Sequence, residues 1–194
     1  MSTEEAPTHQ QPPNGGVAAW TKTLGCFMIY MNTWGIATSF GVYQSYYQQY
    51  TLRDYSASTI SWIGTTQVFL LFFIAIIAGP IYDRGNSQWF LYVGCTLIVF
   101  GYFMLSLATR LYQIFLSQSA CVGIAVSTVA QAFSTKQPIA LGLASTGSAI
   151  GGTIFPIIFR QLTPSIGLSW TNRVFGFLLL ATSVMAAFLL RKSS

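Results

Sequence analysis

The sequence predicts an all-α membrane protein with six transmembrane helices, and three observations indicate it. Hydrophobic residues make up 53% of the 194 positions and charged residues only 7%, against roughly 25% charged residues in an average soluble domain. The mean hydropathy is +0.55. The few charges fall between long apolar stretches. Because a soluble fold would lack a polar surface to cover so much apolar area, we expect the lipid bilayer to surround the protein.

Six apolar stretches of about 20 residues, the length that crosses a bilayer, follow one another along the chain. Turn or charge signals separate them, and the period-two alternation of barrel strands is absent. Short connections make consecutive helices antiparallel neighbours. We expect one membrane domain over 20–194, with spans at 24–47, 60–82, 89–108, 111–132, 139–159 and 172–190.

The first 19 residues read as a disordered tail. They are polar and rich in proline, with Glu4, Glu5 and the single histidine, His9. A signal peptide would need a basic stretch followed by a short apolar core, and neither is present. We therefore expect residues 1–19 to form a cytoplasmic tail.

Several classes of function are excluded by the residue pattern. A catalytic triad would need His9 to leave the tail, and the predicted spans contain no paired carboxylates and no glycine-rich phosphate loop. Cys26, Cys95 and Cys121 lack the spacing of metal ligands. Basic residues stand singly along most of the chain, which excludes nucleic acid as a partner. We expect no enzyme, no catalytic residue, no metal and no cofactor.

Polar and aromatic side chains within the apolar stretches are the candidates for lining a substrate path. For each of them, a hydrogen bond between helices is the alternative role. Asn32 is the best candidate, because an amide deep in a charge-free helix needs partners that a cavity can supply. The full candidate set is Asn32, Thr33, Trp34, Thr38, Gln67, Gln118, Thr146 and Ser148.

Small residues in "LGLASTGSAIGG" indicate close helix packing. Gly147 and Gly151 are spaced i, i+4, as are Ser148 and Gly152. Such spacing lets the backbone of a second helix approach closely.

The stretch "GPIYDRG" places Asp83 beside Arg84 in a short turn between two apolar helices. The spacing of Gly79, Asp83 and Arg84 resembles the cytoplasmic loop signature of the major facilitator superfamily, between its second and third helices. Residues 13–47, 132–152 and the stretch "FPIIFRQLTPSIGLSWTNRVFGF" resemble the fungal monocarboxylate-transporter-like branch. Departures are Asn14, where the branch usually has an acid, and "NSQ" at 86–88, which lacks the closing basic residue.

The resemblance implies one half of a two-half transporter, built from two three-helix repeats, with both termini cytoplasmic and the plasma membrane as its location. Lysine and arginine are divided almost evenly between the two sides, so the loop signature decides this orientation. The implied cargo is a small organic anion or secondary metabolite, and "GSAIGG" loosely resembles a pattern of antiporters, which favours efflux.

Three alternatives stay open, because the chain has the length of one half and we expect a truncated protein. It transports as it stands, two copies form a homodimer that restores two halves, or it is a non-transporting remnant or membrane interaction subunit. Helix four is also short, since only 111–135 lie between Arg110 and Lys136. The resemblance implies a longer stretch there, so we expect an internal deletion near Ala125 and helix four as the least regular helix.

Overall fold

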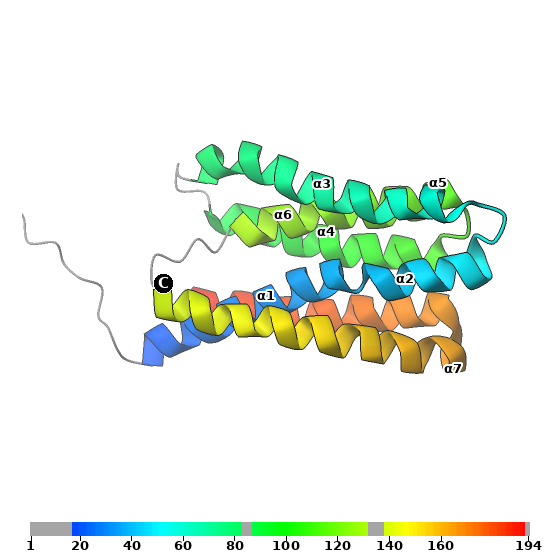
Figure 1. Cartoon of the computed structure of the whole chain (residues 1–194). Helices are drawn as coiled ribbons and strands as arrows, with labels where there is room; N and C mark the ends of the chain where they lie inside the picture. The colour runs from blue at the N-terminus through cyan, green and yellow to red at the C-terminus, as the bar shows by residue number, and fades with distance from the viewer. Residues whose placement is uncertain (1–16, 83–86, 132–137, 193–194) are drawn as a thin grey trace, which may run out of the picture.

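The computed structural model describes residues 17–82, 87–131 and 138–192. Within these ranges the chain is helical apart from short turns, and no strand occurs. The helices run side by side as a bundle (Figure 1). The fold is therefore all-α, as the sequence predicts.

The first and fourth helical segments change helix type along their length, while the second and third are continuous. The first segment comprises α1 (Val17–Thr38), α2 (Phe40–Tyr46) and a π-helical turn (Tyr47–Thr51). α3 (Ala57–Tyr82) and α4 (Ser87–Leu107) follow. The fourth segment comprises α5 (Leu111–Ile114), a π-helical stretch (Phe115–Val122) and α6 (Gly123–Gln131).

α7 (Pro138–Lys192) is a hairpin of two helical arms. Gly167 has φ 78° and ψ 163°, backbone angles that side-chain-bearing residues avoid, and it breaks the helix there. The first arm (138–166) and the second arm (168–192) run in opposite directions (Figure 1). The sequence predicts a loop over 160–171, whereas the structure continues the helix on both sides of Gly167.

Three helical segments in the described part of the chain are long and apolar enough to cross a membrane: Ala57–Ile77, Leu111–Thr128 and Ser145–Leu189. The last contains both arms of α7, and Tyr92–Leu107 is a shorter apolar helix. α1 is not among them, and it carries Lys22 and Asn32 within its apolar sequence. The exact limits of the six expected spans stay a prediction.

The helices pair across the bundle in a consistent pattern. α1 packs along α7, α3 packs along α6, and α4 contacts both α6 and α7. The start of α1 and the end of α7 lie at the same end of the bundle, and the turn between the two arms of α7 lies at the opposite end (Figure 1). Arg53 and Arg110 lie in connections between helices, and Arg160 and Arg173 lie in the two arms of α7, within about two turns of Gly167.

Glycines set the distance between α1 and the first arm of α7. A Cβ on Gly147 would lie 2.5 Å from the carbonyl oxygen of Phe27, and a Cβ on Gly151 would overlap that of Met31. Gly35 in turn faces the ring of Phe155. The two helices run in parallel and touch backbone to backbone, which only glycine permits.

Candidate functional site

The first helical segment exposes a row of four residues on one side, two of which carry hydroxyl groups. Trp34, Thr38, Gly41 and Ser45 follow each other at intervals of three or four residues, and all four are exposed. This spacing places them on one helix face. The hydroxyls of Thr38 and Ser45 donate to the carbonyl oxygens of Trp34 (2.9 Å) and Gly41 (3.0 Å). Their oxygen lone pairs are left to accept a hydrogen bond. We call this row the polar stripe.

A groove of about 480 Å³ lies on one side of the polar stripe, between the first helical segment and α3. Gln44 donates its Nε2 proton to Ser61 Oγ at 2.8 Å across this groove. Gln67 also lines the groove, and its Oε1 is buried without a hydrogen-bond partner. An unpaired buried amide oxygen is costly, so a donor that reaches this atom would stabilise it.

A second groove of about 540 Å³ lies on the other side of the stripe, between α2 with its π-helical turn and the first arm of α7. Ser45 belongs to both the stripe and this groove. Arg160 and Thr163 contribute from the first arm. The polar stripe and the two grooves together make one open face of the bundle.

Asn32 and Thr33 lie inside the bundle, away from this open face. Asn32 is 3% exposed and donates its Nδ2 proton to Thr182 Oγ1 at 2.8 Å, while its Oδ1 has no partner. Thr33 donates to the carbonyl oxygen of Ile29 at 2.9 Å. The amide of Asn32 therefore joins α1 to the second arm of α7.

Gln118 is also buried, and its Oε1 accepts a hydrogen bond of 2.8 Å from the hydroxyl of Tyr47. On the first arm of α7, Thr146 is exposed, and Ser148 donates to the carbonyl oxygen of Ser145 at 2.6 Å. Of the predicted lining residues, the structure thus brings Trp34, Thr38 and Gln67 to the open face.

The loop signature falls at the limit of the described chain. Gly79 belongs to α3, whereas Asp83 and Arg84 lie outside the described residues. Gly152 faces the first helical segment, where a Cβ would lie 3.0 Å from Thr38 Oγ1. In the described ranges no three His, Cys, Asp or Glu residues form a metal-binding group.

Sequence reasoning missed several residues of the two grooves. Ser45, Gln49 and Thr163 give no signal, because single polar residues near helix ends are common. Arg160 did offer one, since it follows the apolar run "TIFPIIF" directly. The distance between α2 and the first arm of α7 decides whether these residues meet, and no local pattern encodes it.

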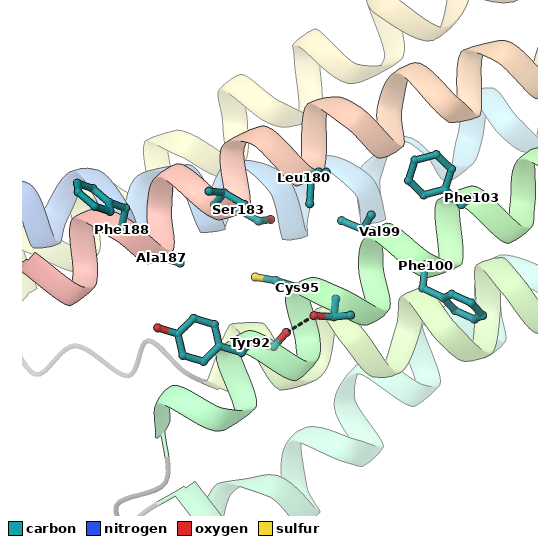
Figure 2. Close-up of a pocket in the computed structure, with 11 residues that line it drawn as sticks. Tyr92, Cys95, Val99, Phe100, Phe103, Leu180, Ser183, Ala187 and Phe188 are labelled. Atoms are coloured by element: carbon teal, nitrogen blue, oxygen red, sulfur yellow. Dashed lines mark hydrogen bonds between the residues drawn. The ribbon is translucent and has the colours of Figure 1, made fainter.

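An apolar pocket of about 580 Å³ lies elsewhere, between α4 and the second arm of α7. Its walls are mainly aromatic and aliphatic, with no charged residue among them. Such a surface suits lipid chains better than a polar cargo. Figure 2 shows Tyr92, Cys95, Val99, Phe100 and Phe103 on one side and Leu180, Ser183, Ala187 and Phe188 on the other.

A family model, the Major Facilitator Superfamily, matches residues 23–194. The chain belongs to the major facilitator superfamily. Its fold is that of an all-α major-facilitator half, in agreement with the resemblance drawn from Gly79, Asp83 and Arg84.

Fungal transporters are similar to this major-facilitator chain over most of its length. An MFS-type transporter of a Phoma species is 40% identical over 188 residues, 93% of this chain and 66% of the relative. One of Emericella nidulans is 44% identical over 177 residues, 87% of this chain and 40% of the relative. An aspyridones efflux protein, also of Emericella nidulans, is 38% identical over 191 residues, 94% of this chain and 39% of the relative.

The chain therefore spans less than two thirds of these relatives. The expected internal deletion near Ala125 stays a prediction.

Proposed function

We propose that this protein takes part in the transport of a small organic anion or secondary metabolite across the plasma membrane, in the direction of efflux. The superfamily membership supports transport. Efflux is supported by the relative that is named as an aspyridones efflux protein. The proposed role is not enzymatic.

The observation that carries the proposal is the open face around the polar stripe. Thr38 and Ser45 stand exposed on a helix of a membrane protein, where lipid contact is unfavourable for polar groups. Grooves of about 480 and 540 Å³ flank them. Each volume lies in the range of small-molecule sites. A water-filled path along this face would satisfy the polar groups and hold a cargo.

A transport assay tests the proposal directly. The whole chain is placed in proteoliposomes, and release of preloaded benzoate, used as a simple aromatic carboxylate, is followed over time. Transport predicts release above that from protein-free vesicles, and a large residue at Ser45, as in Ser45→Trp, is expected to abolish it. Ser165→Trp is the matched control, because Ser165 is exposed at the end of the first arm outside both grooves. Release equal to that of empty vesicles would refute transport by this chain alone.

We also propose that both termini are cytoplasmic. The ends of α1 and α7 lie together at one end of the bundle, which supports a shared side. An N-glycosylation acceptor inserted into the turn at 52–56 should then be modified, and one inserted at 132–137 should not. The reverse pattern of modification would contradict this orientation.

A second candidate is a subunit that does not transport by itself but packs against another half, either a second copy or a different protein. The face of α3 favours this, since Phe69, Phe72, Phe73 and Ile76 are all exposed on this helix. Aromatic residues are enriched at protein–protein interfaces.

A further inference from the structure

We infer that the groove between α2 and the first arm of α7 binds the carboxylate of an aromatic or conjugated organic acid, held by Arg160 and Thr163. This inference rests on the proposed transport function for its biological role and names the class of cargo. Binding of the acid and transport of the acid are separate properties, so each has its own experiment.

Arg160 is a free cation in this groove. Among the described residues it makes no ion pair, hydrogen bond or ring contact, whereas Arg173 lies over the ring of Trp170 at 4.6 Å. Asp54 is the sole carboxylate in the described ranges and forms no ion pair there. The guanidinium of Arg160 is therefore uncompensated at the rim of a site, and its planar donors match the geometry of a carboxylate.

Thr163 supplies a second polar group beside the guanidinium. It lies three residues after Arg160 on the same arm, so the two side chains share a helix face. Thr163 is only 5% exposed, and its hydroxyl has no hydrogen-bond partner. A threonine hydroxyl in a helix usually donates to a backbone carbonyl four residues earlier. The Thr163 hydroxyl has no such acceptor, as expected if it donates to an oxygen atom of a ligand.

The opposite wall of the groove is aromatic. Tyr46 and Tyr50 are stacked, with ring centroids 4.8 Å apart, and Tyr46 meets the edge of Phe159 at 6.0 Å. Flat rings favour a flat ligand body by stacking. Arg53 lies over the Tyr50 ring at 5.6 Å and adds positive charge on the same side. An anionic head group and a planar body together describe the ligand.

Binding is measured by isothermal titration calorimetry on the whole chain in nanodiscs of zwitterionic phosphatidylcholine. The probes are 2-naphthoate and its uncharged counterpart 2-naphthamide. We expect saturable binding of naphthoate and at least tenfold weaker binding of the amide. Arg160→Gln should weaken naphthoate binding by roughly tenfold or more, because it removes a charge-assisted hydrogen bond. Thr163→Val, which keeps the shape of the side chain, should weaken it by about threefold or more.

Arg173→Gln is the matched control, because it removes one arginine from the same end of the bundle without touching the groove. It should leave naphthoate affinity unchanged. Melting curves should show all three variants folded. Arg160→Gln should match the parent because Arg160 is exposed, and Thr163→Val should match or exceed it because an unpaired buried hydroxyl is removed.

Three results would overturn the inference: no saturable naphthoate binding by the folded chain, equal binding of naphthoate and naphthamide, or the same affinity in Arg160→Gln as in Arg173→Gln. Naphthoate binding with the expected pattern but no vesicle release would leave this inference standing and remove the proposed transport function. Benzoate release that Arg160→Gln does not change would leave the transport function standing and would count against this inference.

Discussion

Tyr43 and Asn172 join three helices through two side chains. The hydroxyl of Tyr43 on α2 donates to Asn172 Oδ1 at 2.9 Å. Asn172 on the second arm of α7 in turn donates its Nδ2 proton to the carbonyl oxygen of Leu105 on α4 at 3.4 Å. Tyr43 and Asn172 are both buried. Water therefore cannot replace either partner if the bond between the Tyr43 hydroxyl and Asn172 Oδ1 is lost.

Replacing Tyr43 by phenylalanine should therefore destabilise the protein, because it leaves Asn172 Oδ1 buried without a donor. We expect a loss of about 1 kcal/mol, within the range measured for hydrogen bonds between membrane helices. For a chain of this size that lowers the unfolding midpoint by about 2–4 °C. Thermal unfolding in detergent measures it. Tyr55→Phe, at an exposed position, is the control, and an equal shift in both variants would contradict the role of the bond.

Asn32 shows how far single residues can be understood from the sequence. Its amide stands out because the predicted span 24–47 carries no charge, and the structure gives its Nδ2 a partner. That partner, Thr182, lies 150 positions away, and no local pattern links the two. The sequence predicts which polar groups need partners. It does not predict whether a helix or a cargo supplies them.

At the scale of helices, the contact between α1 and the first arm of α7 depends on glycine. We expect Gly151→Ala to force the two helices apart, because the new methyl group would meet the Met31 backbone rather than a movable side chain. Overpacking of this kind costs about 1–3 kcal/mol. Thermal unfolding again provides the measurement.

Gly142→Ala is the control for this substitution. Gly142 lies on the same arm, and a Cβ there would meet nothing within 4 Å. The change should leave stability unchanged or raise it by up to about 1 kcal/mol, the difference in helix propensity. Equal midpoints for the two variants would show that the helices can separate freely at Gly151.

Gly167 separates the two arms of α7 through a backbone conformation that favours glycine. Its φ of 78° with ψ of 163° would strain any other residue. We expect Gly167→Ala to destabilise the hairpin by about 1–3 kcal/mol, although a Cβ there has open space around it. A midpoint equal to that of the parent would show that the turn adopts other backbone angles.

The helices themselves were largely predictable, since runs of about 20 apolar residues leave few alternatives in a membrane. Two features could not be predicted from the sequence: the helical course of residues 160–171 and the π-helical turn at Tyr47–Thr51. The loop expected at 160–171 is helical on both sides of Gly167, because neither Pro164 nor the polar residues around it break the first arm. The sequence predicts helix four as the least regular helix. That segment contains the π-helical stretch Phe115–Val122, but the first segment also changes helix type, so the ranking stays a prediction. The similar turn at Tyr47–Thr51 had no visible signal.

At the scale of the whole molecule, the open face raises the question of assembly. If two copies pair through the polar stripe, cysteine placed at Thr38 should crosslink between copies in native membranes. Phe188→Cys is the control, because Phe188 is exposed on the second arm beside the apolar pocket. Crosslinking at Thr38→Cys alone supports a face-to-face dimer. Crosslinking at neither position would contradict it.

The hydrogen bond between Asn32 and Thr182 also has a consequence for synthesis of the protein. A ribosome adds about 5–20 residues per second, so the 150 positions between them take about 8–30 s. The α7 glycines that pack against α1, Gly147 and Gly151, are made before Thr182. The close contact between α1 and the first arm can therefore form while the Asn32 amide still lacks the Thr182 hydroxyl. We expect the hydrogen bond between Asn32 and Thr182 to be among the last contacts of α1 to form during synthesis.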